Sequence, residues 1–284
     1  MKYLSPLLFG MAVIIFTLSP TFATVADELL LGIHPYKSAK ILHKSFAPLA
    51  EVISRATGKP VRIVIAKDYQ QHIQQVGKSK LDIAYMGPVS YVQLVARYGP
   101  MPMLARLEIN GSPTFQGHIF ARATDTIRTL NDIKGKQFAF GNPASTMSHL
   151  VPRHMLWKAG VGAENLAGFD FLGNHTNVAL AVLSGKYDAG AVKEEVFHKN
   201  KSRGLRSIAV TPKLSEHLFV ANTNLPKQQF DIIRKAMLSL HQQKNGMVTL
   251  RGIKKTMTAL VPVKDNDYDN LRQILKELAS IGVK

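Results

Sequence analysis

The sequence predicts an α/β protein of two lobes, each with a mainly parallel sheet flanked by helices. Three observations support this prediction. Short apolar runs alternate along the chain with segments whose apolar residues recur at helical spacing. The alternation starts again near residue 130, which indicates a second lobe, and the chain from residue 226 onward reads as helices. The length of 284 residues suits one large domain or two small ones.

The first series of elements runs from residue 29 to residue 121. Leu29–Ile33 is a short apolar run typical of a buried strand, and apolar residues between 42 and 53 recur at the spacing of a helix that Gly58 ends. Asn110-Gly111-Ser112-Pro113 predicts a turn between the last two strands. The other expected elements are strands at 61–65, 81–85, 101–107 and 117–121 and helices at 69–76 and 88–98.

The second series runs from residue 130 to residue 220, and a helical tail follows it. Strands separated by helices imply parallel pairing in both series. The expected elements are a helical turn at 130–133, strands at 136–140, 169–172, 188–192, 205–210 and 217–220, and helices at about 148–159 and 177–184. The tail is predicted to hold helices at 226–243, 247–259 and 268–281.

Residues 1–26 are typical of a secretory signal peptide. Lys2 supplies a positive charge, and residues 7–18 form an uncharged apolar run that is too short to span a bilayer comfortably. Cleavage is expected after Ala23 or Ala26, with an uncleaved anchor as the alternative. The mature protein is therefore expected to be soluble and periplasmic.

The composition limits the classes of function. Lys and Arg number 36 against 19 Asp plus Glu, and the resulting charge of +17 favours acidic partners such as nucleic acid, anionic membranes or small anions. Export and the lack of a recognition motif argue against nucleic acid. The absence of cysteine excludes disulfides, thiolate zinc sites, a Cys nucleophile and a lipoprotein anchor. Nucleophile-elbow, Walker, zincin and dinucleotide motifs are also missing, so we expect no enzyme, no cofactor and no metal.

The most informative segment is Phe140–Pro152, which follows a predicted strand and leads into a predicted helix. Ser145, Thr146 and Ser148 place hydroxyls and backbone N–H groups where that helix begins, and such a terminus attracts anions. An ordinary helix cap is the alternative interpretation. Pro152 must either start the main helix or kink it.

Three further residues follow predicted strands, where ligands gather in open α/β sheets. Tyr85 ends one strand, and Tyr36 lies just past another. His175 precedes a helix and can donate to an oxyanion. A structural role for the tyrosines and simple exposure of the histidine remain the alternatives.

Several segments, in this order, resemble the periplasmic phosphate/phosphite/phosphonate-binding proteins of ABC importers. They are GIHPY, FAPLAEVISRATGKPV, LDIAYMGPVSY, NPASTMSHLVP and NHTNVALAVLSGKYDAGAV, followed by the helical tail, and the resemblance covers Asp27 to Lys284. It implies the two-lobe periplasmic binding protein fold with two hinge crossings. It also implies that Ser145 and Thr146 grip an oxyanion, that Tyr36 and Tyr85 approach from the other lobe, and that His175 completes the cradle.

The sequence departs from the family pattern at two places. The family motif commonly reads Ser-Thr-Ser-Gly, whereas Met147 and Ser148 occupy its last two positions here, and we expect Met147 to limit what else fits. Thr176 follows His175 where an aminophosphonate binder would offer a carboxylate. Capture of a phosphonate that carries an amine is therefore not expected.

The predicted function is a monomeric solute-binding protein that passes a small oxyanion to an ABC permease. Lobe 1 is expected at 27–112 plus 216–284 and lobe 2 at 113–215, with crossings near 107–116 and 211–216. A ligand-binding subunit of a sensor kinase system is the runner-up. A phosphatase or phosphonate hydrolase, and a basic protein adhering to envelope surfaces, are the competing classes.

Overall fold

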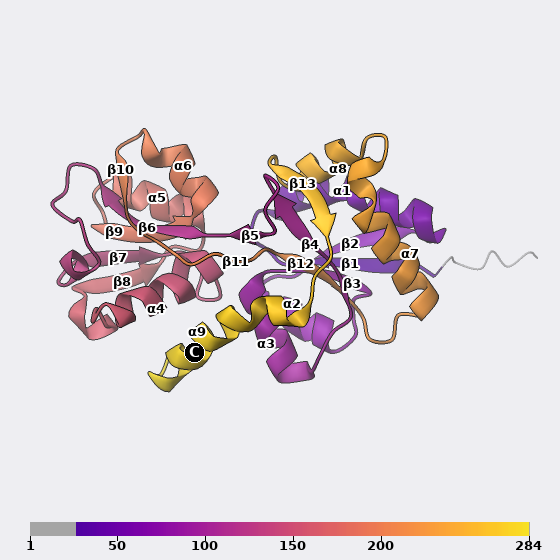
Figure 1. Ribbon diagram of the computed structural model, residues 1–284, viewed down its shortest axis with the longest axis horizontal. Helices are drawn as coiled ribbons and strands as arrows, with labels where there is room; N and C mark the ends of the chain where they lie inside the picture. Colours follow the sequence, from indigo (N-terminus) through magenta and orange to yellow (C-terminus); the bar gives the residue numbers. More distant parts are fainter. Residues whose placement is uncertain (1–26, 284) are drawn as a thin grey trace, which may run out of the picture.

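The computed structural model describes residues 27–283 and shows two lobes joined by extended crossings (Figure 1). The predicted signal peptide, residues 1–26, lies outside the described residues. Within them, no helix combines the length and the apolar character needed to cross a membrane.

Lobe 1 contains a six-stranded sheet in the order β13-β4-β12-β3-β1-β2. The strands are β1 (Leu29–Ile33), β2 (Val61–Ile65), β3 (Ile83–Met86), β4 (Met103–Ile109), β12 (Leu218–Ala221) and β13 (Met257–Val261). The helices around it are α1 (Ala39–Thr57), α2 (Tyr69–Gly77), α3 (Pro88–Tyr98), α7 (Lys227–Leu238), α8 (Gly246–Ile253) and α9 (Asp269–Ser280). As expected, Gly58 ends α1, with a φ of 70° and its N–H on the Ser54 carbonyl.

Lobe 2 contains a five-stranded sheet in the order β10-β6-β9-β7-β8. The strands are β6 (Gly117–Arg122), β7 (Gln137–Phe140), β8 (Gly168–Phe171), β9 (Ala189–Lys193) and β10 (Leu205–Val210). The helices are α4 (Val151–Lys158), α5 (His175–Leu183) and α6 (Glu194–Lys201), and 3₁₀ turns lie at Asn131–Ile133 and Ala163–Asn165. Two further 3₁₀ turns, Leu240–Gln242 and Asp265–Tyr268, belong to lobe 1.

The chain crosses between the sheets in two antiparallel segments that pair with each other. These are β5 (Thr114–Phe115) and β11 (Leu214–Ser215). Both crossings are extended, and Figure 1 shows them side by side between the lobes.

The two-lobe α/β fold was predicted correctly, but the prediction of mainly parallel sheets was wrong. Both sheets are mixed: β12 runs antiparallel to β3 and β4, and β6 runs antiparallel to β9 and β10. Parallel neighbours need a crossover connection, usually a helix. The strands that enter each lobe directly from a crossing, β6 after β5 and β12 after β11, have no such helix before them, and they run opposite to β9 and β3, respectively.

The predicted helix at 247–259 was also wrong in its second half. Helix α8 ends at Ile253, and β13 follows and pairs with β4. The apolar residues of this stretch fit helical spacing and strand alternation equally, and only pairing with a strand distant in sequence decides between them.

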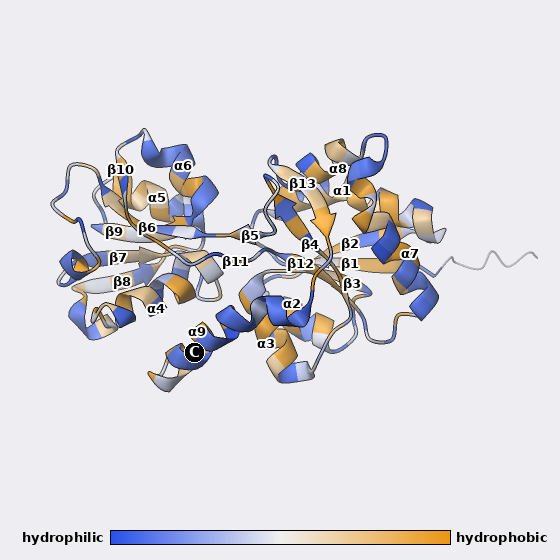
Figure 2. Ribbon diagram, in the orientation of Figure 1, coloured by the Kyte–Doolittle hydropathy of each residue, from blue (hydrophilic) through white to orange (hydrophobic). Residues whose placement is uncertain are grey.

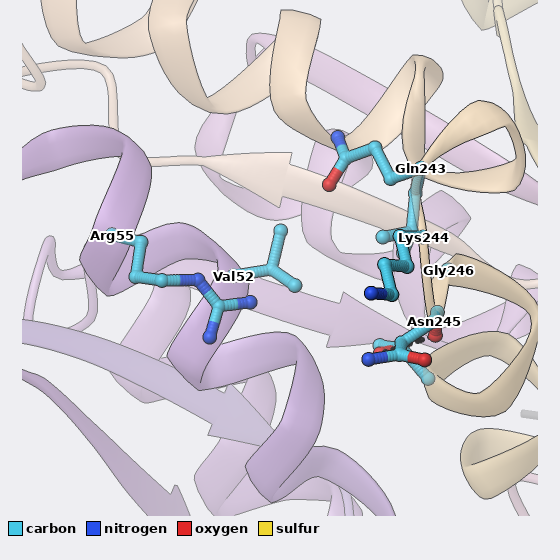
Figure 3. Close-up of a pocket in the computed structure, with 8 residues that line it drawn as sticks. Val52, Arg55, Gln243, Lys244, Asn245 and Gly246 are labelled. Carbon is cyan, nitrogen blue, oxygen red and sulfur yellow. Dashed lines mark hydrogen bonds between the residues drawn. The ribbon is translucent and has the colours of Figure 1, made fainter.

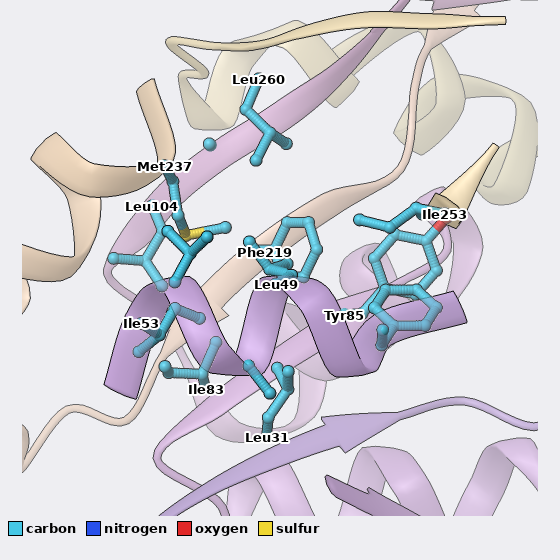
Figure 4. Close-up of a cluster of buried hydrophobic side chains, with 14 of the residues drawn as sticks. Leu31, Leu49, Ile53, Ile83, Tyr85, Leu104, Phe219, Met237, Ile253 and Leu260 are labelled. Atoms are coloured by element: carbon cyan, nitrogen blue, oxygen red, sulfur yellow. The ribbon is translucent and has the colours of Figure 1, made fainter. Parts of the chain in front are cut away.

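The core of lobe 1 lies between α1, α7, α8 and one face of the sheet. Figure 4 shows Leu49 of α1, Tyr85 of β3 and Phe219 of β12 within this cluster. Figure 2 shows hydrophobic β1 and β13 in lobe 1 and a largely hydrophilic α6 in lobe 2. Buried apolar side chains of this kind each contribute about 1.5–3 kcal/mol to folding.

Helix α9 packs against both lobes. It contacts α3 of lobe 1 and α4 of lobe 2. The Glu277 carboxylate of α9 lies 2.9 Å from Nε2 of His154 and 2.8 Å from Nζ of Lys158, both on α4. The C-terminal helix therefore links the lobes on one side of the molecule.

Candidate ligand-binding site

The serine-threonine segment lies at the carboxyl end of β7, in a π-helical turn over Thr146–Leu150. The N–H of Leu150 bonds the Ser145 carbonyl, five residues earlier. Pro152 lies in the first turn of α4, so it starts the main helix, one of the two predicted outcomes. The π turn therefore leads directly into α4, where Pro152 occupies a first-turn position that needs no N–H donor.

The hydroxyls of this segment differ in their roles. The Ser145 Oγ accepts a hydrogen bond from the Ser148 N–H at 3.2 Å, as a cap does. The Ser148 hydroxyl is fully buried and donates to the Ala191 carbonyl of β9. A Cβ on Gly141 would lie 2.5 Å from the Ser148 Oγ, so only glycine allows this close approach. We expected Ser148 to bind the ligand, but its hydroxyl is buried and bonded to the sheet, so it holds the turn in place and is not counted among the proposed donors.

Met147 packs at the chain crossings, in a buried cluster with Leu214 and Phe115. It is 1% exposed, and its Sδ lies 3.3 Å from Oγ1 of Thr211, which also accepts from the Gly117 N–H. Met147 thus packs where both chain crossings enter lobe 2. We expected it to limit what fits beside the ligand, but its contacts assign it to packing at the crossings.

His175 is the first residue of α5, beside the same edge of the lobe 2 sheet. Its Nδ1 accepts a hydrogen bond from the Lys193 N–H at 3.1 Å, so in the neutral ring Nε2 carries the proton. Burial and the charges of Lys193 and His217 lower its pKa from 6.5 to about 3. His175 is therefore a neutral hydrogen-bond donor at physiological pH.

Tyr85 is held rigidly in lobe 1. It is 4% exposed, and its ring stacks on His217 with centroids 5.5 Å apart. His34 stacks on it at 5.2 Å, and Tyr36 lies 6.0 Å away. Burial raises the pKa of both tyrosines well above 10, so their hydroxyls remain protonated donors.

The start of α3 is a part of the site that the sequence interpretation missed. Gly87 and Pro88 turn the chain from β3 into α3, and the Val89 N–H donates to Thr146 Oγ1 across the lobes at 3.4 Å. Ser90 is 1% exposed, and its Oγ has no hydrogen-bond partner among the described residues. The Gly-Pro turn before a helix is the signal that could have revealed these donors.

Two ion pairs near the site were also missed, one with a buried carboxylate and one with an exposed carboxylate. In lobe 1 the Glu216 carboxylate bonds His217 Nδ1 at 2.8 Å and Lys254 Nζ at 3.1 Å. Burial alone would raise the pKa of Glu216, but these partners hold it at about 2. In lobe 2 Lys193 pairs with Glu195 at 3.2 Å, and burial lowers the pKa of that lysine. The sequence did not predict these ion pairs, because their positions relative to the site are set only by the folded chain.

The predicted residues thus form two groups, one on each lobe. Ser145, Thr146, Ser148 and His175 gather at the carboxyl edge of the lobe 2 sheet, and Tyr36 and Tyr85 gather on lobe 1. The Thr146–Val89 hydrogen bond links the groups, and the charges of Glu195 and His217 act across the lobes on Tyr36 and His175, respectively.

Two surface hollows lie elsewhere on lobe 1, and none of the predicted residues lines either. One, of about 280 Å³, is lined by Arg55 and Lys244 among others (Figure 3). Arg55 is largely exposed. This hollow lacks the converging buried donors that lie between the lobes.

The chain is similar to known periplasmic binding proteins in both sequence and fold. Residues 31–268 match the family described as "ABC transporter, phosphonate, periplasmic substrate-binding protein". The phosphate-import protein PhnD of Mycolicibacterium smegmatis is 27% identical over 90% of this chain and 87% of its own length. The probable ABC transporter phosphite binding protein PhnD1 of Prochlorococcus marinus is 24% identical over 73% of each chain.

Solved structures show the same fold. The structure of PhnD1 from Prochlorococcus marinus in complex with methylphosphonate has a TM-score of 0.78 at 22% identity, covering 89% of this chain and 98% of the other. A binding component of a phosphonate ABC transporter from Pseudomonas aeruginosa has a TM-score of 0.77 at 21% identity, covering 91% and 89%.

Proposed function

This chain belongs to the family of periplasmic substrate-binding proteins of phosphonate ABC transporters, and from that premise we propose that its two lobes close on a small phosphorus oxyanion. The family consists of binding proteins rather than enzymes. The finer proposal concerns which residues hold the ligand and which ligand they select.

The proposed cradle consists of neutral donors from both lobes. Ser145, Thr146 and His175 donate from lobe 2, and Tyr36 and Tyr85 donate from lobe 1. The observation that carries the proposal is that Thr146 meets the first turn of α3 across the lobes. There the hydroxyl and the backbone N–H groups of a helix terminus can converge on one tetrahedral anion.

The charged pairs argue for a ligand without an amine. Both carboxylates beside the cradle, Glu195 and Glu216, are already paired with Lys193 and Lys254. A ligand ammonium would meet those lysines instead of a free carboxylate. Phosphate, phosphite and methylphosphonate, the ligands that the names of the related proteins mention, all lack an amine.

Lobe closure follows from the placement of the donors. We assign residues 27–112 plus 216–284 to lobe 1 and residues 113–215 to lobe 2, with the hinge at β5 and β11. A ligand that contacts both lobes favours the closed state because only that state offers both sets of contacts. The closed, monomeric form then docks on the permease, with a sensor kinase as the alternative partner.

Export is the remaining part of the proposal. Residues 1–26 act as a cleaved signal peptide, so periplasmic protein begins at Thr24 or Asp27. Intact-mass analysis of periplasmic extracts measures this directly. Detection of full-length chain in the membrane fraction contradicts it.

Calorimetric titration of the mature protein tests the ligand class. We expect one-to-one binding of phosphate, phosphite or methylphosphonate, and weaker binding of 2-aminoethylphosphonate and sulfate. At a hundredfold excess over its Kd, the ligand adds about 2.7 kcal/mol to the free energy of unfolding. Preference for the aminophosphonate would overturn the selection argument, and failure of all five anions to bind would overturn the proposed function.

A further inference from the structure

A second cluster of ligating side chains lies within lobe 2 and takes no part in the oxyanion cradle. It consists of His118 on β6 and of Glu194 and His198 on α6. Glu194 and His198 are four residues apart and share one face of the helix. Their Oε1 and Nε2 atoms are 3.5 Å apart, and the ligand atoms of all three residues lie within 4.8 Å of one another.

His118 is the unusual member of this cluster. It is 6% exposed, and its ring stacks on Phe197 with centroids 4.2 Å apart. Its Nδ1 lies 2.8 Å from the Ser207 Oγ, whereas its Nε2 is buried and has no hydrogen-bond partner among the described residues. A buried polar atom without a partner is costly, so its retention calls for a ligand.

The surroundings of His118 match those of a metal-binding histidine. Such a ring commonly donates its other N–H to a neighbouring acceptor, which fixes the tautomer. Here the Ser207 Oγ can accept a hydrogen bond from the protonated Nδ1, and the unprotonated Nε2 is then free to bind a metal ion. The neutral ring is the form that binds metal.

We propose that His118, Glu194 and His198 bind a divalent transition-metal ion. Two imidazoles and one carboxylate are a ligand set of zinc, with a further position left for water. Hard cations such as Mg²⁺ prefer oxygen ligands and fit this set poorly. The buried His118 is anchored, whereas Glu194 and His198 are about half-exposed and can rotate to close on the ion.

This site stands apart from the proposed function, because all three residues belong to lobe 2 and none donates to the oxyanion cradle. Zinc binding is therefore expected with and without phosphate-type ligands. A result for one site leaves the other unaffected, so the two proposals fail separately.

Titration of chelator-treated, tag-free mature protein with ZnCl₂ tests the proposal. We expect saturable binding of one Zn²⁺ per chain and no comparable binding of Mg²⁺. His198→Ala should weaken zinc binding by at least about tenfold. His43→Ala, which changes an exposed histidine of α1, is the matched control and should bind zinc like the parent.

A spectroscopic readout identifies the buried ligand without replacing it. Long-range ¹H–¹⁵N spectra of histidine should show a zinc-induced shift of the His118 Nε2 resonance. The proposal is overturned if the parent takes up no stoichiometric zinc, if His198→Ala and His43→Ala bind it equally, or if the His118 signal does not move.

Discussion

The two lobes contribute chemically different halves of the proposed oxyanion site. Lobe 2 supplies the hydroxyls of Ser145 and Thr146 at a π-helical turn and a histidine at the start of α5. Lobe 1 supplies tyrosines whose rings belong to its aromatic and aliphatic core. The hydroxyls of lobe 2 could be lost with little effect on the core, whereas the Tyr85 ring is part of it.

This difference teaches how binding and folding are shared between the lobes. Removing a donor from lobe 2 should affect mainly the ligand affinity. Removing an aromatic ring from lobe 1 should affect mainly the stability. The predictions below test that division, from the largest expected effect to the smallest.

The largest effect is expected for Tyr85→Ala in lobe 1. The substitution removes a ring that packs against Phe46 and Phe219, and the free energy of unfolding should fall by about 3–5 kcal/mol. Tyr85→Phe is the matched control, since it keeps the ring and loses only the hydroxyl. We expect it to fold like the parent and to bind the oxyanion more weakly. Denaturant melts and calorimetry measure the two effects, and equal affinity in Tyr85→Phe would remove this tyrosine from the site.

The second prediction concerns the hydroxyls of lobe 2. Thr146→Ala and Ser145→Ala should each remove a hydrogen bond to a charged ligand, worth about 1.5–3 kcal/mol, or about ten- to a hundredfold in affinity. Folding should lose only about 1 kcal/mol, as expected from a lost cap. Thr146→Ser, which retains the hydroxyl, is the control for Thr146→Ala. Parent-like affinity in both alanine variants would reduce the segment to a helix cap.

The third prediction concerns acid stability and applies to both lobes. Burial is the main cause that lowers the pKa of His72 in lobe 1 to about 4 and the pKa values of His149 and His175 in lobe 2 to about 4 and 3. The unfolded chain therefore binds protons first as the pH falls below 6.5. Stability present above pH 6.5 is lost toward pH 4, by about 1.4 kcal/mol per pH unit for each histidine.

Urea melts of the unliganded protein at several pH values between 7 and 4 measure this slope. His175→Asn removes one of these histidines, so the slope of unfolding free energy against pH should decrease by up to about 1.4 kcal/mol per pH unit. Stability that stays constant over this range would show that these histidines are not held neutral by the fold.

The smallest effect is expected at the contact between α9 and α4. Glu277→Gln weakens the bonds to His154 and Lys158 that link the lobes, so the unliganded protein should open slightly. Small-angle scattering should show a small increase in radius, and ligand affinity should fall by less than about fivefold. Glu51→Gln, which loses an exposed pair within lobe 1, is the control. If both variants scatter alike, α9 does not help to hold the lobes together.

Local patterns in the sequence predicted most of the elements correctly. The apolar face of α1, its glycine end and the β-branched run of β2 each depend on neighbours in the chain. The segment from Ser145 to Pro152 likewise predicts a helix start, because capping residues and prolines affect only the few residues next to them. The strand β13 was not predicted, because its apolar residues also fit a helix and only pairing with β4 makes it a strand.

The sequence by itself determined the alternation of strands and helices, the hydroxyl-rich helix start and the tyrosines at or just past strand ends. These depend on the spacing and chemistry of residues that are close along the chain. The tertiary structure alone decided the antiparallel strands, the burial of Met147 at the crossings, the Glu216–Lys254 pair and the grouping of His118 with α6. Each of these joins residues far apart in sequence, and their meeting depends on the summed packing of both lobes rather than on any local preference.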